Sequence, residues 1–248
     1  MELQSLRKGR YAARLARGQD DVAAAQRLRG LVFRGAGDAQ DGDAFDAVCH
    51  HVLIEEARNG RLIGCYRLLP LRGGAEIGRS YAAQHYGLAG LESFSGPMVE
   101  IGRFCVHPEW RDPDILRVAW AVMTRFVDET GVEMLFGCSS FRGTCSGDHI
   151  EAFTLLAERH LAPGRFLPAI KAPDVVRFVP SQPCRPAPDA KRAMLTMPPL
   201  LRSYLAMGGW VSDHAVVDRD LGTLHVFTGL EIREMPPTRK RLLRAAAA

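Results

Sequence analysis

An acid and a base lie within one apolar stretch of the chain, and their types suit proton transfer. Glu100 and Arg103 belong to residues 99–106, Val-Glu-Ile-Gly-Arg-Phe-Cys-Val, which the apolar run predicts as a strand. A carboxylate inside an apolar strand costs folding free energy unless it has a partner or a chemical role. The strand ends at His107-Pro108, directly before a helix signal. We therefore expect Glu100 and Arg103 to be catalytic.

Three further charged residues lie beside predicted strands. Asp43 and Asp46 precede the strand that starts near residue 51, and Arg67 lies within the apolar residues 62–69. Two interpretations stay open, namely structural ion pairs and a functional polar site. Desolvating several charges is costly, and a structural pair gains little over an apolar isostere. We therefore favour a functional site.

Other sites with reactive side chains have weaker signals. His50 and His51 are adjacent, so on a strand they point to opposite faces and cannot share one metal ion. His107 has no HExxH or CxxC motif near it, so no metal site is predicted. Ser139 and Ser140 follow an apolar strand without the nucleophile-elbow pattern, and a substrate-lining role suits them better.

Composition excludes several classes of protein. The 248 residues are 47% hydrophobic and 24% charged, which is ordinary for a soluble globular chain. The net charge of +4 comes without a basic stripe interleaved with aromatics, so we expect no nucleic-acid partner. No 18-residue apolar run and no secretory signal are present, which predicts a cytoplasmic protein. The cysteines lack CxxC spacing and are expected to be reduced thiols: Cys49, Cys65, Cys105, Cys138, Cys145 and Cys184.

Apolar periodicity and turn residues predict a mixed α/β chain. Asn59-Gly60 predicts a hairpin turn, Asp112 with Pro113 predicts a helix start, and Gly131 predicts its end. The predicted helices are 22–33, 113–130, 151–160 and 200–207, with a short helix and loop over 79–92. The predicted strands are 51–56, 62–69, 99–106, 132–138, 210–217 and 222–229. Residues 163–188 are rich in proline and read as an irregular connection inside one domain, 1–234.

The last residues, 235–248, form a basic tail. This tail contains four basic residues and no acid after Glu234: Arg239, Lys240, Arg241 and Arg244. One interpretation is a solvated helix end. The other is contact with an anionic membrane surface, at about 1 kcal/mol per basic residue, or with an acidic protein. The second would make the protein peripheral on the inner membrane.

The predicted strand 99–106, then Val-His-Pro-Glu-Trp-Arg, then a helix resembles the central motif of the GCN5-related N-acetyltransferase superfamily. The resemblance implies a mixed, mostly antiparallel sheet flanked by helices. In that superfamily a Gly-rich loop and the helix N-terminus hold the coenzyme A pyrophosphate. Here residues 111–115 lack glycine, Pro113 has no N–H, and Asp112 and Asp114 bring negative charge. We therefore expect an acyl carrier protein, with its phosphopantetheine thioester, as donor and no separate cofactor.

Four segments in order resemble the bacterial L-ornithine Nα-acyltransferase family: 43–49, 66–69, 100–108 and 135–144. Pro198-Pro199-Leu200-Leu201 with Tyr204 is also similar, so the resemblance covers about residues 22–230. One departure is His50, where the family pattern suggests Asp. The resemblance implies transfer of a 3-hydroxyacyl chain from acyl carrier protein to the α-amine of L-ornithine, which gives lyso-ornithine lipid. Acyl-homoserine lactone synthases and long-chain N-acyl amino acid synthases are more distantly similar and give the rival enzyme reading.

The resemblance also suggests roles for residues. Glu100 would be the general base, and Arg103 would orient it or bind a substrate carboxylate. Arg67 would bind the ornithine α-carboxylate, and Asp43 or Asp46 would receive the δ-ammonium.

The strand end and a second strand complete the expected site. Backbone N–H groups near Cys105 and Val106 would hold the thioester oxygen, while Ser139 and Ser140 would line the substrate. A non-enzymatic alternative is a scaffold that only binds acyl carrier protein.

Overall fold

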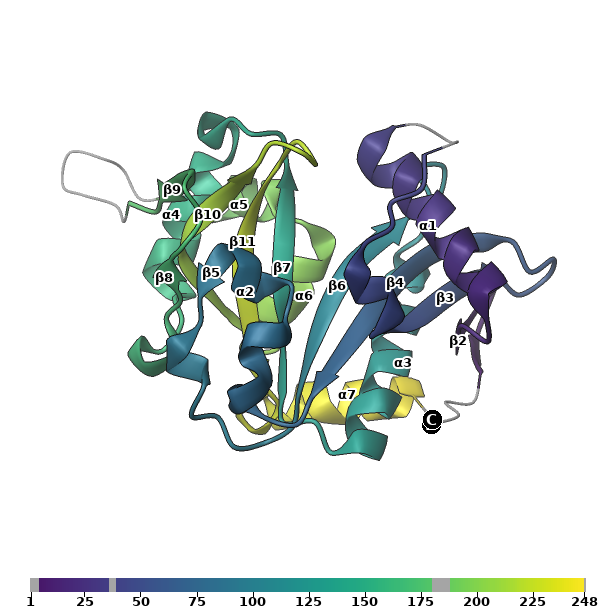
Figure 1. The fold of residues 1–248 in the computed structure, drawn as a ribbon. Coiled ribbons are helices and arrows are strands. Elements are labelled where there is room, and N and C mark those ends of the chain that lie inside the picture. The colour runs from purple at the N-terminus through teal and green to yellow at the C-terminus, as the bar shows by residue number, and fades with distance from the viewer. Residues whose placement is uncertain (1–4, 36–38, 180–187, 248) are drawn as a thin grey trace. The chain divides into compact units, whose positions relative to one another are not determined.

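The computed structural model describes residues 5–35, 39–179 and 188–247 (Figure 1). Internal contacts divide the chain into two compact units. The first unit holds residues 1–70, 99–132 and 237–248, and the second holds 71–98 and 133–236. The single domain over 1–234 stays a prediction.

The first unit contains five neighbouring strands in the order β1-β2-β3-β4-β6. Their bounds are β1 Leu6–Lys8, β2 Tyr11–Leu15, β3 His50–Glu56, β4 Leu62–Leu71 and β6 Met98–Val106. Strands β1 to β4 pair antiparallel with their neighbours. The hairpin between β3 and β4 and the strand over 99–106 confirm the sequence prediction. The β1–β2 hairpin was not predicted.

Two helices cover opposite faces of this sheet. Helix α1, Gln19–Arg34, packs Ala25 and Leu28 in one apolar cluster with Cys65 of β4. The next residue, Tyr66, points to the other face and donates a hydrogen bond to the Ala119 carbonyl of α3, Pro113–Thr130, at 3.0 Å. Because successive strand residues alternate between faces, the α1 face also receives Arg67.

Helix α3 begins and ends where the sequence predicts. The Asp112 carboxylate accepts a hydrogen bond from the Asp114 amide at 2.9 Å, which caps the first turn. Gly131 has a φ of +67°, a left-handed conformation that glycine adopts without steric cost.

The basic tail forms helix α7, Pro237–Ala247, which packs against α3 in the first unit. Arg244 pairs with Asp128 at 2.8 Å, and the Arg125 guanidinium donates to the Ala247 carbonyl at 2.7 Å. Arg239, Arg241 and Leu242 are exposed. Contact of this helix with lipid stays a prediction. Within the described residues, the structure has no helix with the length and hydropathy to cross a membrane.

The second unit has an antiparallel sheet in the order β7-β11-β10-β9. Its strands are β7 Met134–Arg142, β9 Val175–Arg177, β10 Trp210–Asp218 and β11 Thr223–Glu231, with a small pair of β5 Tyr86–Gly87 and β8 Ala169–Ile170. Its helices are α2 Ala82–His85, α4 Ile150–Arg159, α5 Ala190–Thr196 and α6 Pro199–Ala206. The core joins α4, α5 and α6 to β7, β10 and β11. Strands β8 and β9 lie in the stretch predicted as irregular, and part of that stretch, 180–187, lies outside the described residues.

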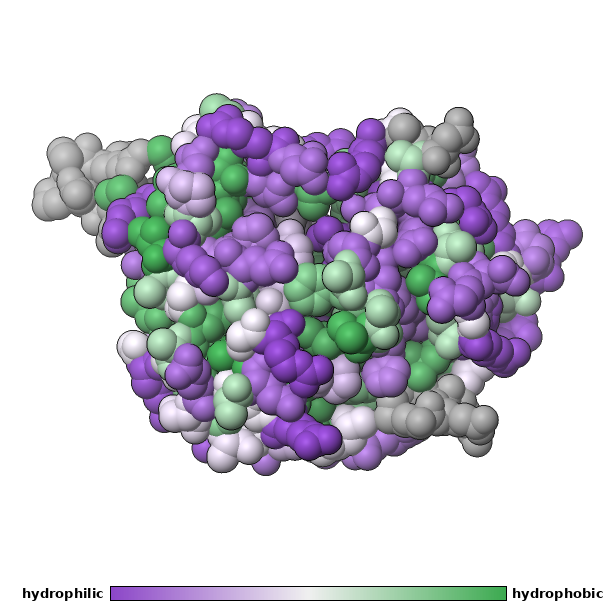
Figure 2. All heavy atoms as spheres, viewed as in Figure 1, coloured by the Kyte–Doolittle hydropathy of each residue, from purple (hydrophilic) through white to green (hydrophobic). Residues whose placement is uncertain are grey.

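Surface and thiols agree with the composition. Figure 2 shows polar and apolar side chains interspersed over the visible face. Within the part of the chain that the structure describes, five cysteines form no disulfide, and Cys184 lies outside that part. Sheets flanked by helices, with antiparallel pairing dominant, confirm the predicted fold class.

Candidate active site

Guanidinium and carboxylate groups form one largely buried network in the first unit. It is built by α1, β4, β6, a 3-10 turn over Ala44–Ala47 and the residues before that turn. We call its six members the ion network: Arg29, Asp41, Asp43, Asp46, Arg67 and Arg103. Four of these six were predicted as site residues, whereas Arg29 and Asp41 were not.

Arg67 lies at the centre of the ion network. Its two terminal nitrogens donate to the Asp43 carboxylate at 2.6 and 2.8 Å, and Nη1 also donates to Asp46 at 2.9 Å. The guanidinium lies 5.4 Å from the centre of the Phe45 ring. Only 3% of the Arg67 side chain is exposed. Carboxylates of the chain itself therefore occupy both terminal nitrogens of Arg67. Binding of a substrate carboxylate by Arg67 stays a prediction.

Asp43 and Asp46 are fixed by the turn that they begin. The Asp43 carboxylate accepts from the Phe45 amide, and Asp46 accepts from the Asp43 amide at 3.3 Å, which forms a capping box. Burial alone would raise the pKa of both carboxyls. Hydrogen bonds from Arg67 to Asp43 and from Arg29 to Asp46 outweigh it and lower both pKa values. Both residues are therefore carboxylates at neutral pH.

Arg29 and Asp41 extend the ion network into α1. Arg29 is 1% exposed and donates to both oxygens of Asp46, at 2.8 and 2.7 Å. It also bonds the backbone carbonyl of Asp41 at 3.0 Å and lies 3.2 Å from the Asp41 carboxylate. Every carboxylate of the ion network therefore contacts at least two guanidinium groups, and Asp41 also contacts a third, that of Arg34, at 3.5 Å.

Arg103 joins strand β6 to the ion network. Its Nε donates to Asp41 at 2.9 Å, and its Nη2 donates to Asp43 at 3.3 Å. Its φ of +54° makes it the only non-glycine with a left-handed backbone among the described residues. Such a residue interrupts the regular alternation of side chains along a strand.

The contacts of Gly102 and Cys105 indicate which face of β6 carries Glu100. Cys105 packs with Ala25 on the α1 side, and a Cβ added to Gly102 would lie 3.4 Å from Arg67 Nε on the same side. Residues three apart share a face only if the alternation shifts between them. Glu100, two residues before Gly102, therefore shares the face of the ion network.

Glu100 is 4% exposed and lies near Cys49. Burial raises the pKa of the Cys49 thiol to about 12, and the negative charge of Glu100 adds to the rise. Cys49 is therefore a neutral thiol and not a nucleophile. A buried carboxylate on the ion-network face suits general base chemistry.

The predicted thioester contacts lie at the end of β6. Cys105 is buried, and its Sγ lies 3.5 Å from Cys65 Sγ. The hydrogen bond between the two thiols and the burial raise the pKa of Cys105. The thiol is thus unsuited to attack. Hydrogen bonding of a thioester oxygen by the amides near Cys105 and Val106 stays a prediction.

The predicted serines lie on β7 of the second unit. Ser139 is buried and its Oγ accepts from Thr228 Oγ1 at 3.0 Å, while Ser140 is exposed. Their substrate-lining role stays a prediction.

The histidines carry no metal cluster. His51 is buried and its Nε2 lies 3.1 Å from the Asp46 carbonyl, whereas His50 is exposed. Burial lowers the pKa of His51, which keeps the ring neutral at pH 7. Among the described residues no group of three His, Cys, Asp or Glu side chains could hold a metal ion.

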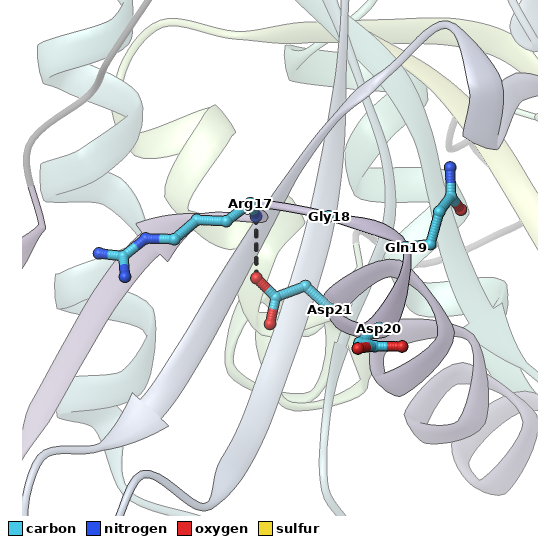
Figure 3. Close-up of a pocket in the computed structure, with 5 residues that line it drawn as sticks. All are labelled: Arg17, Gly18, Gln19, Asp20 and Asp21. Carbon is cyan, nitrogen blue, oxygen red and sulfur yellow. Dashed lines mark hydrogen bonds between the residues drawn. The ribbon is translucent and has the colours of Figure 1, made fainter.

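A hollow of about 360 Å³ opens at the start of α1 and is lined by residues 17–21 (Figure 3). The Asp21 carboxylate there accepts from the Arg17 amide at 2.8 Å and from Arg14 at 2.6 Å. The hydrogen bond from Arg14 is the main cause that lowers the Asp21 pKa to about 2. Because the chain's own carboxylate occupies this helix start, the hollow does not suit an anionic substrate.

Comparisons with known proteins agree with this geometry. The family model described as acetyltransferase (GNAT) domain matches residues 28–121, which include the whole ion network and Glu100. The L-ornithine N(alpha)-acyltransferase of Rhodobacter capsulatus is 32% identical over 91% of this chain and 91% of its own. The enzyme of the same name from Rhizobium meliloti is 32% identical over 88% of this chain and 79% of its own. The solved structure of FeeM, an N-acyl amino acid synthase from uncultured soil microbes, covers 92% of this chain and 95% of its own. It has a TM-score of 0.52 at 12% identity, which supports the fold. The chain is an N-acyltransferase and belongs to the L-ornithine N(alpha)-acyltransferase family.

Proposed function

We propose that the protein transfers a 3-hydroxyacyl chain from acyl carrier protein to the α-amine of L-ornithine and so makes lyso-ornithine lipid. The observation that carries this proposal is the buried Glu100, which shares one face of β6 with the ion network. The names of the relatives add ornithine as the acceptor.

The ion network suits an acceptor that carries both signs of charge. Ornithine brings one carboxylate and two ammonium groups. Asp43 and Arg103 are the most exposed members of the ion network, with 26% and 13% of their side chains accessible. Their contact at 3.3 Å is longer than either Arg67–Asp43 bond. An ammonium on Asp43 and a carboxylate on Arg103 would exchange this contact for two charge-assisted hydrogen bonds.

The reaction needs the amine without its extra proton. Glu100 accepts that proton, directly or through water, and the free amine attacks the thioester carbonyl. The C–N bond of the amide forms, the C–S bond breaks, and the thiol of phosphopantetheine leaves with a proton. Amides near Cys105 and Val106 stabilise the oxyanion that forms on the carbonyl.

The start of α3 supports a carrier protein over coenzyme A as the donor. Pro113 has no N–H, and the Asp114 and Ile115 amides already donate to Asp112. The Asp112 carboxylate also accepts a hydrogen bond from the Tyr11 hydroxyl at 2.8 Å. The pKa of Asp112 is lowered, chiefly by the hydrogen bond from the Asp114 amide. A pyrophosphate would meet negative charge where the superfamily offers free amides.

The proposal is tested with purified protein, ornithine and one donor at a time. We expect N-acylornithine, detected by mass spectrometry, from 3-hydroxyacyl carrier protein and far less from the matching acyl-coenzyme A. Product from coenzyme A alone would contradict the donor assignment.

The acceptor has its own arm of the experiment. S-adenosylmethionine replaces ornithine, and formation of acyl-homoserine lactone would favour the rival enzyme reading. The scaffold interpretation requires no product with any acceptor.

A further inference from the structure

The backbone of Arg103 is held in a conformation that its side chain disfavours. An L-residue in the left-handed region is sterically disfavoured relative to one in the right-handed region, because its Cβ lies too close to the following carbonyl oxygen. Such a conformation persists only where the surroundings hold it. The φ of +54° at Arg103 therefore needs an anchor, because the shift that lets Glu100 and Cys105 share the ion-network face depends on it.

Asp41 has the position of such an anchor. It is 3% exposed, and its carboxylate accepts from Arg103 Nε at 2.9 Å. Asp41 is itself tied to α1, because its amide donates to the Gln26 carbonyl at 3.1 Å and its carbonyl accepts from Arg29 at 3.0 Å.

We propose that Asp41 is a positioning residue, which holds Arg103 in its left-handed conformation and thereby fixes Glu100 on the face of the ion network. In this role Asp41 acts through Arg103, and its carboxylate also lies 3.2 Å from Arg29 and 3.5 Å from Arg34. The activity that it supports is the acyl transfer to ornithine proposed above, on which this inference rests.

Asp41 suits this role better than Asp43, because it is more buried and bonds Arg103 at a shorter distance. Asp43 reaches Arg103 at 3.3 Å but is a quarter exposed and already holds Arg67 through two shorter bonds. Asp41 makes the shorter bond to Arg103 from a sealed position. Removing the charge of Asp41 therefore weakens the shorter of these two bonds to Arg103.

The test is a double-mutant cycle on Asp41→Asn and Arg103→Gly. We expect Asp41→Asn to lower kcat about 10-fold or more, because a small misplacement of a catalytic group is costly. Glycine adopts a positive φ without strain, so the same Asp41→Asn change should alter kcat less than about 2-fold in the Arg103→Gly background. Equal losses in both backgrounds would overturn the proposal.

A matched control is Asp21→Asn. Asp21 is also a carboxylate of the first unit paired with an arginine, Arg14, but it lies outside the ion network. The acid limb of the kcat–pH profile, which reports Glu100, should move in Asp41→Asn and not in Asp21→Asn. A profile of Asp41→Asn identical to that of the wild type contradicts positioning of Glu100.

Hydrogen–deuterium exchange gives a readout that needs no substrate. Amides of residues 98–106 should exchange faster in Asp41→Asn and at the wild-type rate in Asp21→Asn. If the wild type makes no acylornithine, the proposed function fails, whereas unchanged exchange in β6 refutes the role of Asp41 by itself.

If Asp41→Asn does not fold, Asp41→Glu keeps the charge and moves the carboxylate by one methylene. A lower kcat at an unchanged melting temperature supports the proposal. Wild-type kcat in Asp41→Glu goes against it.

Discussion

Arg67 shows how a residue chosen for chemistry can have a large structural part. Its guanidinium balances Asp43 and Asp46 in a sealed position. Arg67→Ala should lower the free energy of unfolding by about 3 kcal/mol, because Asp43 and Asp46 each lose one of their guanidinium partners in a largely buried network. Urea denaturation measures this loss. Arg61→Ala, which removes an exposed pair with Glu109, is the control and should cost less than about 1 kcal/mol. Equal costs would mean that the ion network adds nothing to stability.

The role of Glu100 can be tested by removing its charge. Glu100→Gln keeps the shape of the side chain and removes its ability to accept a proton. We expect kcat to fall at least ~10²-fold while the melting temperature stays near that of the wild type, since general base catalysis contributes about that factor. Steady-state kinetics at saturating ornithine give the number. Wild-type turnover in this variant removes Glu100 from the role of base.

The pH dependence of stability follows from groups whose pKa is lowered by folding. His51 titrates below its ordinary 6.5 in the folded protein because it is buried, and Asp21 near 2 instead of 3.8. A depressed pKa contributes stability that is complete above the unfolded value and is lost as pH falls. The free energy of unfolding should therefore decrease first below about pH 6.5 and again below about pH 4. Urea titrations at several pH values check this, and His51→Gln should remove part of the first decrease.

Sequence reasoning found the polar residues that interrupt apolar strands and missed those that sit where charge is common. The charged residues Glu100, Arg103 and Arg67 are conspicuous because the residues around them in the sequence are mostly apolar. Arg29 lies in an amphipathic helix and Asp41 in a loop, where charged residues raise no question. Only the folded chain shows that both are buried.

Elements with strong end signals were predicted closely. Asp112, Pro113 and Gly131 mark both ends of α3, and the Asn59-Gly60 turn fixes the β3–β4 hairpin. The turn between β1 and β2 contains Gly9 at a φ of +58°, but three-residue β1 and five-residue β2 are too short to show a clear alternation in the sequence. The positive φ of Arg103 was also beyond prediction, since the side chain that adopts it gives no local sign.

The end of α3 gives a prediction at the scale of one element. Gly131→Ala should lower the free energy of unfolding by roughly 1 kcal/mol, because alanine disfavours the φ of +67°. No atom lies within 4 Å of the added methyl group, so the loss would report backbone strain alone. Thermal unfolding measures it. Gly78→Ala, with equal space and no positive φ, is the matched control and should change stability little.

At the scale of the chain, both ends belong to the same compact unit. The β1–β2 hairpin from the start and α7 from the end both contact α3. The Lys8 ammonium donates to the Ala246 carbonyl at 2.9 Å, which joins the two ends directly. One side of helix α7 thus packs against α3 as part of the folded unit, while Arg239 and Arg241 face solvent.

Removal of residues 237–248 tests whether the tail has a structural role. The truncation deletes the acceptors of Lys8 and Arg125 and exposes the surface of α3 that α7 covers. Two lost hydrogen bonds correspond to about 2 kcal/mol, and the uncovered apolar surface adds to this loss. We expect a lower melting temperature with kcat retained below the transition, because the ion network and Glu100 do not include α7. Arg244→Ala, which removes only an exposed pair, should keep the wild-type melting temperature. A truncated chain that melts like the wild type would instead make the tail a solvated addition, and its basic residues would then be free for a partner.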